Sequence, residues 1–111
     1  MKNSQLYKGS LSTIIMKLLE ENGRMYGYEI TQKVAILTQG QITLTYGALY
    51  PVLHKLEKEG ALLTESEIIN NRNRIYYKLT KKGNDTAREK IKELEDFINT
   101  IGILLKPEMG K

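Results

Sequence analysis

The chain has 111 residues, no cysteine and one histidine, and its 17 Lys and Arg residues against 13 Asp and Glu residues give a net charge of +4. A chain of this length forms one small domain, and without cysteine it has neither a disulfide framework nor a thiolate site. It contains no signal peptide and no apolar run of about eighteen residues, so we expect a cytoplasmic protein; its moderate positive charge permits nucleic-acid binding without requiring it.

Two helices are predicted in the first third of the chain. Residues 1–9 are polar without a clear period, so they predict a loose arm that can become helical on packing. Ser10 is a suitable N-cap for a helix whose apolar residues keep helical spacing as far as a strong stop at Asn22-Gly23. A second helix over residues 26–38 has apolar positions at i, i+4 and i+7: Ile30, Val34 and Leu37.

A third helix is predicted over residues 46–60, after a polar connection that makes a helix-turn-helix. Thr43 and Thr45 bracket its entry, Thr45 is the expected N-cap, and Pro51 predicts an irregular first turn. Its apolar stripe predicts a buried side: Leu49, Val52, Leu53 and Leu56. At about 100° per residue, the opposite side has no carboxylate and suits DNA: Gly47, Tyr50, Pro51, His54 and Lys58. A purely structural amphipathic helix is the alternative.

A β-hairpin is predicted after the third helix. Residues 62–69 and 74–79 are rich in strand formers, and the cluster Asn70-Asn71-Arg72-Asn73 predicts the turn between them. Alternation in the second strand predicts one apolar face and one basic face. From residue 70 to 82 the chain has no acid and five basic residues: Arg72, Arg74, Lys78, Lys81 and Lys82. We interpret this hairpin as a phosphate-contacting element; a charged edge that only discourages strand pairing is the alternative.

A long helix is predicted from Thr80 to a stop at Pro107. Its apolar positions, four and three residues apart, form a heptad seam: Ala87, Ile91, Leu94, Ile98, Ile101 and Leu105. At about 1.5 Å per residue this helix extends roughly 38 Å, further than so small a domain can cover. We therefore expect the seam to form a homodimer, and the alternative is a helix that folds back on its own core. Residues 1–80 would be the DNA-binding domain, and residues 81–111 the dimerisation helix and tail.

These elements predict an α+β, mainly α fold: a winged helix-turn-helix with a long C-terminal dimerisation helix. Three runs resemble the PadR family of bacterial transcriptional regulators. Gly47-Ala-Leu-Tyr-Pro-Val-Leu-His-Lys-Leu-Glu-Lys-Glu-Gly60 resembles its recognition-helix signature, and Arg74-Ile-Tyr-Tyr-Lys-Leu-Thr-Lys-Lys-Gly83 resembles the end of its wing. Tyr26-Gly-Tyr-Glu-Ile30 resembles the start of its second helix. The likeness covers about Leu6 to Leu105. In its short length and single terminal helix, the chain resembles the compact subfamily.

The resemblance implies a homodimeric repressor that a small-molecule effector or another signal commonly releases from its operator. Ala48 stands where a threonine is more usual, so a hydroxyl contact of relatives is missing here. Compact members that bind flat aromatic drugs between subunits can rely on a tryptophan; this chain has none, and Phe97 would supply a weaker apolar wall. The signature positions filled as in the family are Tyr50, Pro51, Leu53, Leu56, Glu57 and Gly60.

The sequence thus predicts a sequence-specific regulator that binds double-stranded DNA as a homodimer on an inverted repeat. An enzyme, a cofactor and a metal site are not expected, because the chain has one histidine and no cysteine, and no Gly-rich phosphate loop or metal-ligand spacing occurs. A membrane partner is not expected either, because there is no long apolar run. A winged helix that binds protein without specific DNA binding is the alternative, which the basic hairpin disfavours. The residues expected to contact DNA are Thr43, Thr45, Tyr46, Tyr50, His54, Lys58, Arg72, Arg74 and Lys78.

Overall fold

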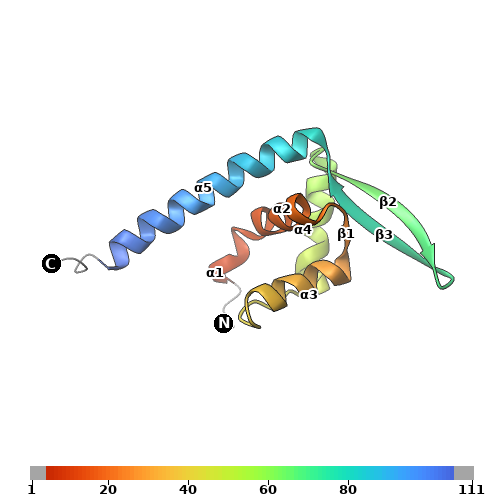
Figure 1. Cartoon of the computed structure of the whole chain (residues 1–111), viewed down its shortest axis with the longest axis horizontal. Helices are drawn as coiled ribbons and strands as arrows, with labels where there is room; N and C mark the ends of the chain where they lie inside the picture. The colour runs from red at the N-terminus through yellow and green to blue at the C-terminus, as the bar shows by residue number, and fades with distance from the viewer. Residues whose placement is uncertain (1–4, 107–111) are drawn as a thin grey trace.

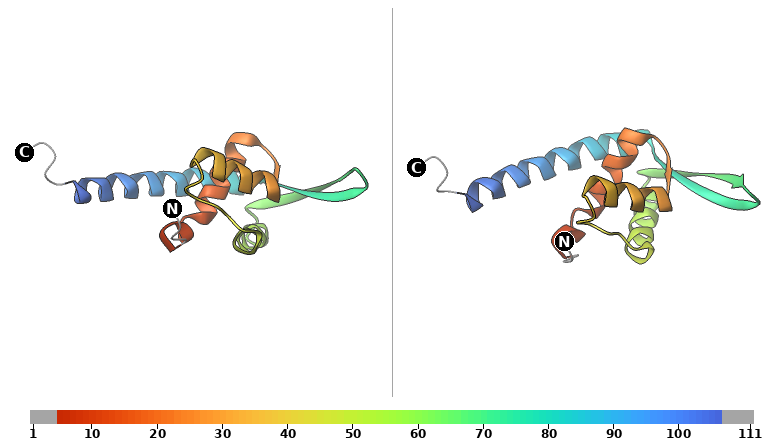
Figure 2. Two further views of the ribbon diagram at one scale, coloured as in Figure 1. Left: turned by 90° about the horizontal axis from the view of Figure 1, so that it is seen from below. Right: turned by 60° about the horizontal axis from the view of Figure 1, so that its bottom comes forward.

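The computed structural model describes residues 5–106. A hairpin and a long helix extend from a helical core toward opposite ends of a molecule that measures 62 × 29 × 20 Å (Figures 1 and 2). This is the mainly helical α+β winged helix-turn-helix that the sequence predicts. In chain order its elements are α1 (Gln5–Lys8), α2 (Leu11–Asn22), β1 (Met25–Tyr26), α3 (Gly27–Leu37), α4 (Tyr46–Lys58), β2 (Leu62–Ile69), β3 (Arg72–Leu79) and α5 (Lys81–Leu105).

The predicted helix boundaries depend on local caps, and the structure confirms most of them. Gly23 follows the last residue of α2 with a φ of 78°, a backbone conformation that glycine adopts without steric cost. The Thr45 hydroxyl accepts a hydrogen bond of 3.2 Å from the Ala48 N–H and caps α4. Likewise, the Thr80 hydroxyl accepts one of 3.0 Å from the Gly83 N–H and caps α5.

Within the predicted arm, Gln5–Lys8 forms a helix, an outcome that the sequence left open; the start of the arm lies outside the described residues. Two local predictions need correction. Ser10 precedes α2, but its side chain makes no capping hydrogen bond. α4 continues without interruption through Pro51. Because proline has no N–H, the carbonyl of Gly47 lacks its helical hydrogen-bond donor, and Gly47 is exposed to solvent. Pro107, expected to end α5, also lies outside the described residues.

One hydrophobic core joins the apolar sides of α2, α3 and α4 to the inner face of the sheet. Leu49 and Leu53 of α4 are completely buried and Leu56 nearly so, as predicted, while Val52 is half-buried. Burial of a side chain of this size stabilises the fold by about 1.5–3 kcal/mol. The largest fully buried side chains of the described residues are Ile15, Met16, Leu19, Ile30, Leu49 and Leu53. The core therefore fixes which side of α4 faces solvent.

The sheet has the strand order β1-β3-β2 and is antiparallel throughout. β2 and β3 pair along their whole length and form the wing, a name used here for the hairpin of residues 62–79. β1 was not predicted, because it consists of two residues, Met25 and Tyr26, which pair with Tyr77 and Tyr76 of β3. This short strand joins the wing to the start of α3.

The turn of the wing is shorter than predicted. Asn70 and Asn71 have φ values of 52° and 61°, so they form a two-residue turn, and β3 begins at Arg72. Asparagine tolerates this left-handed conformation, and two such residues in succession match the twist of a hairpin. Arg72 and Asn73 are therefore strand residues rather than turn residues.

The direction of α5 is set where its first turn crosses the chain between α4 and β2. The Thr80 hydroxyl donates to the Gly60 carbonyl at 2.6 Å, and the Thr80 N–H donates to the Ala61 carbonyl at 3.0 Å. Gly83 packs so closely against this segment that an added Cβ would overlap the Ala61 carbonyl oxygen. Backbone atoms on both sides of the contact leave no flexible side chain that could move away.

We expect Gly83→Ala to destabilise the protein by at least about 1–3 kcal/mol, the usual cost of overpacking, because the obstructing atom belongs to the backbone. Gly102→Ala is the matched control: it lies in the same helix with nothing within 4 Å of an added Cβ, and alanine should stabilise the helix by up to about 1 kcal/mol. Urea unfolding of both variants measures the difference. Equal stability of the two variants would contradict the close contact.

Candidate nucleic-acid interface

A groove of about 680 Å³ lies between the first half of α4, the start of α3 and the tip of the wing. Arg72 and Arg74 of β3 also line it. Arginine and tyrosine side chains are common donors to phosphate oxygens, so this composition suits a nucleic-acid backbone. The lining includes five tyrosines: Tyr26, Tyr28, Tyr46, Tyr50 and Tyr77.

The side of α4 opposite the core carries a continuous stripe of rings. The ring centroid of Tyr50 lies 5.7 Å from that of Tyr46 and 6.1 Å from that of His54, as residues four apart on a helix should. Tyr46 is 50% exposed and His54 is exposed. Tyr50 is only partly exposed, and its hydroxyl lies where a Cβ on Gly27 would be. Tyr50 therefore packs α4 against the start of α3 as well as lining the groove.

The remaining residues predicted on this side of the molecule lie at the two ends of α4. Thr43 is exposed before the helix, and its carbonyl accepts a hydrogen bond of 3.4 Å from the Tyr7 hydroxyl. Thr45 is exposed, and its hydroxyl is used for the cap of α4. Lys58 is exposed in the last turn. All three residues are therefore accessible to solvent.

The outer face of the wing is not the purely basic face that the sequence predicts. Antiparallel pairing places Glu67 opposite Arg74 and Glu65 opposite Tyr76, so the acids of β2 share this face with the cations of β3. The Lys78 ammonium lies 3.0 Å from the Glu65 carboxylate. The charges along one strand do not include the acids that pairing with the neighbouring strand brings beside them.

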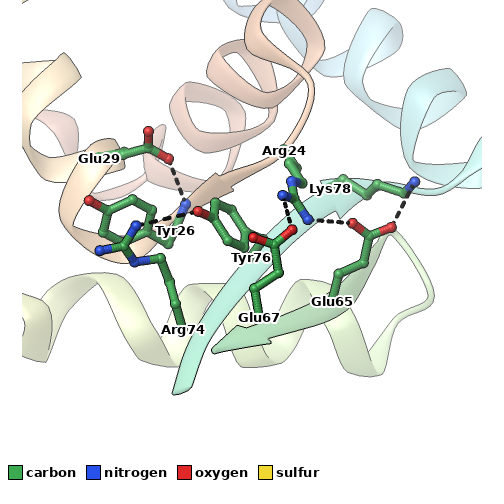
Figure 3. Close-up of polar contacts among 8 residues, drawn as sticks. All are labelled: Arg24, Tyr26, Glu29, Glu65, Glu67, Arg74, Tyr76 and Lys78. Carbon is green, nitrogen blue, oxygen red and sulfur yellow. Dashed lines mark hydrogen bonds and ion pairs between the residues drawn. The ribbon is translucent and has the colours of Figure 1, made fainter. Parts of the chain in front are cut away.

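Arg24, which is not among the residues predicted from the sequence to contact DNA, crosses this outer face (Figure 3). Its guanidinium donates to Glu65 at 3.0 Å and to Glu67, and its central carbon lies 4.0 Å from the ring centroid of Tyr76. Lys78 and then Arg24, by hydrogen bonding, lower the pKa of Glu65 below its ordinary value, while the bond to Glu67 raises the pKa of Arg24. The partners are 41 and 43 residues from Arg24 in the chain, so no local sequence signal indicates them.

The two arginines of β3 differ in their surroundings. The guanidinium carbon of Arg74 lies 4.1 Å from the ring centroid of Tyr26, and one of its nitrogens donates to the Tyr76 hydroxyl at 3.5 Å (Figure 3). Arg72 is exposed, and within residues 5–106 its side chain has no ion pair, hydrogen bond or ring contact. Of the three cations predicted at the wing, Arg72 is thus the one whose charge is uncommitted in the described part of the chain.

The predicted seam of α5 divides into two parts. Ala87 is completely buried and Ile91 packs beside it, both within the core of their own protomer, so a partner cannot use Ala87. Further along, Ile98 and Leu105 are 58% and 72% exposed. Leu94 and Ile101 are partly exposed, and other large apolar side chains are exposed nearby: Phe97, Ile103 and Leu104.

A second, apolar groove of about 380 Å³ lies between α2, the end of α3 and α5. Among its lining residues are Ile14, Leu18, Leu37, Ile42, Leu94 and Ile98. In residues 5–106, no three His, Cys, Asp or Glu side chains come together as metal ligands. The helices within that same range are also too short or too polar to cross a bilayer.

Comparison with known proteins agrees with this geometry. Residues 15–89 match the transcriptional regulator PadR-like family. Transcriptional regulator Rv3488 of Mycobacterium tuberculosis is 29% identical over 80 residues, which are 72% of each chain.

Two solved structures are similar along nearly the whole chain. A transcriptional regulator from Clostridium thermocellum has a TM-score of 0.80 and 31% identity, over 96% of this chain and 100% of its own. A PadR-like transcriptional regulator from Bacillus cereus has a TM-score of 0.78 and 26% identity, over 93% of this chain and 98% of its own. The family consists of DNA-binding regulators rather than enzymes. With its winged helix-turn-helix, its groove between α4 and the wing, and a family match over most of its length, the chain belongs to the PadR-like family of transcriptional regulators.

Proposed function

We propose that this PadR-family regulator is a cytoplasmic repressor that binds an inverted-repeat operator in double-stranded DNA as a homodimer and responds to a small-molecule effector. The observation that carries the proposal is the exposed stripe of rings on α4 beside a groove with the uncommitted Arg72. Repression and release by an effector follow the family resemblance. A protein-binding winged helix is less favoured, because this surface combines a free cation with exposed tyrosines and contains no acid among the lining residues of the groove.

In this proposal α4 enters the major groove, whose width of about 12 Å admits a helix. Tyr46 and His54 reach base edges or the DNA backbone from the exposed stripe. Tyr50 packs on α3 and thereby fixes the position of α4, and of these two side chains, relative to α3. Three polar residues at the ends of α4 face phosphates: Thr43, Thr45 and Lys58. Arg72 reaches a phosphate or the minor groove from the wing.

The dimer in this proposal forms through the outer part of α5. Ile98 and Leu105 leave apolar surface exposed that no element within residues 5–106 covers, and a second copy would remove it from water. Two-fold symmetry would then present two α4 helices to successive major grooves, about one helical turn apart. The apolar groove beneath Leu94 and Ile98 lies next to this surface, and its volume suits a small effector. An effector there would change how α5 meets its partner and hence the spacing of the two α4 helices.

The direct test is a selection of duplexes from a random pool by the purified protein. We expect enrichment of an inverted repeat whose half-sites are centred about one helical turn apart, because a two-fold dimer presents the same residues to both halves. Sequencing of the bound duplexes over several rounds measures it. Recovery of no preferred sequence would contradict specific DNA binding, and an enriched single half-site would contradict the dimer.

Arg72→Ala should weaken binding to every duplex and make the slope of log K against log[salt] shallower by about 0.9, the contribution of one phosphate contact on B-DNA. Fluorescence anisotropy titrations at several salt concentrations measure the slope. Arg88→Ala is the matched control: it removes the same charge from an exposed position on α5 that does not line the groove. If both variants keep the slope of the wild type, Arg72 does not contact phosphate.

Ile98→Glu should convert the dimer to a monomer and weaken binding to the inverted repeat far more than to a half-site. It would place two like charges in the apolar interface, at a cost of several kcal/mol. Light scattering at micromolar concentration gives the molar mass. Thr100→Glu adds the same charge about 200° away around α5 and should remain dimeric. A monomeric wild type, or a dimeric Ile98→Glu with full affinity, would exclude α5 from the interface.

A further inference from the structure

The tip of the wing extends beyond the part of the sheet that supports it. β2 and β3 pair over eight residues each, but β1 covers only Tyr76 and Tyr77 of β3. The segment Arg72–Ile75 therefore has one strand edge without a neighbouring strand (Figure 1). A two-stranded ribbon of this kind is only marginally stable by itself, so its position depends on side-chain contacts.

Arg74 makes such a contact from the unsupported segment. Its guanidinium lies over the ring of Tyr26, the last residue of β1, with its central carbon 4.1 Å from the ring centroid (Figure 3). The same guanidinium also donates a hydrogen bond of 3.5 Å to the Tyr76 hydroxyl. That bond raises the pKa of Arg74, although an arginine is cationic at physiological pH even without it.

Tyr26 is itself held in place at the start of α3. Its ring meets the Tyr76 ring edge-on at 5.5 Å and stacks with the Tyr28 ring at 6.4 Å. Its backbone N–H donates to the Glu29 carboxylate at 3.1 Å, one turn into α3. Because α3 also contacts α4 through Gly27 and Tyr50, a contact on Tyr26 connects the wing tip to the helix pair that forms the other wall of the groove.

We propose that Arg74 is a positioning residue: by stacking on Tyr26 it holds the wing tip at a fixed distance from α4, so that Arg72, and not Arg74, makes the phosphate contact. This inference rests on the proposed DNA binding. The two residues lie on the same strand, two positions apart. Arg74 has a stacking partner and a hydrogen bond, whereas Arg72 has neither within the described residues. From the sequence alone, both residues are expected to contact DNA.

The salt dependence of DNA binding separates the two roles. Binding of the selected duplex is measured for wild type, Arg74→Met, Tyr26→Leu, the double variant and Arg74→Lys. Loss of one exposed cation–π contact should weaken binding about two- to fivefold in each single variant and leave the salt slope unchanged. The double variant should bind no more weakly than either single variant, because both remove the same contact. Arg74→Lys should restore little, since lysine keeps the charge without the planar group.

Hydrogen exchange in the protein without DNA gives a second readout. In Arg74→Met and in Tyr26→Leu, the amides of residues 72–75 that bond to β2 should exchange about two- to fivefold faster, because the tip opens more often. Amides of α5 should be unaffected, which excludes a global loss of stability. Arg88→Met is the matched control for loss of charge and should leave the wing unchanged.

Two outcomes would overturn the inference. The first is a salt slope lowered by about one in Arg74→Met and restored in Arg74→Lys, with losses that add to those of Tyr26→Leu; this is the behaviour of a phosphate contact. The second is unchanged exchange at residues 72–75 in both single variants. If the wild type selects no duplex, the proposed function fails instead, and hydrogen exchange still decides whether Arg74 holds the wing tip.

Discussion

The burial of one side of α4 is the interaction on which the arrangement of the whole site depends. Leu49 and Leu53 are completely buried, and with about 100° between successive residues their burial turns Tyr46 and His54 toward solvent. The Thr45 cap fixes where this rotation starts. A change in the core that rotated α4 by one residue would move the exposed rings away from the groove, even if no residue of the groove were altered. In this way the hydrophobic effect decides which side chains are presented to a ligand.

The wing shows a different balance. The acids of β2 compensate part of its positive charge, and the position of each remaining cation matters more than the number of cations. Arg24 and Lys78 pair with the acids of β2, so within the described residues the cations of this face without an ion pair are Arg72 and Arg74. Exposed ion pairs of this kind add little stability one by one, usually under about 1 kcal/mol. Their geometric effect is larger, because Arg24, just before the start of β1, connects this strand to β2 across β3, which lies between them. The uncommitted cation, Arg72, then lies at the tip of a hairpin whose direction is defined.

α5 belongs partly to the core and partly to solvent. The start of α5, here called its root, is fixed by the backbone contact of Gly83 with Ala61 and by burial of Ala87. The helix therefore cannot swing freely relative to α4 and the wing. Its outer part, including Ile98 and Leu105, leaves apolar surface exposed. A rigid root is what a dimer would need in order to transmit the spacing of two subunits to two recognition helices, and the same rigidity would let a small change at α5 alter that spacing.

The sequence by itself determined the features that depend on neighbours a few residues away: the helices, from apolar spacing and from the caps at Thr45 and Thr80, and the existence of the hairpin. Only the tertiary structure decided the contacts between distant segments. β1 is too short to have a pattern of its own, and Arg24 meets acids 41 and 43 residues away. Tyr50 occupied an outward position by periodicity, yet it packs on Gly27, because a residue at the edge of a helix face can be covered by another helix. Periodicity tells which way a side chain points, while the packing of elements determines what it meets there.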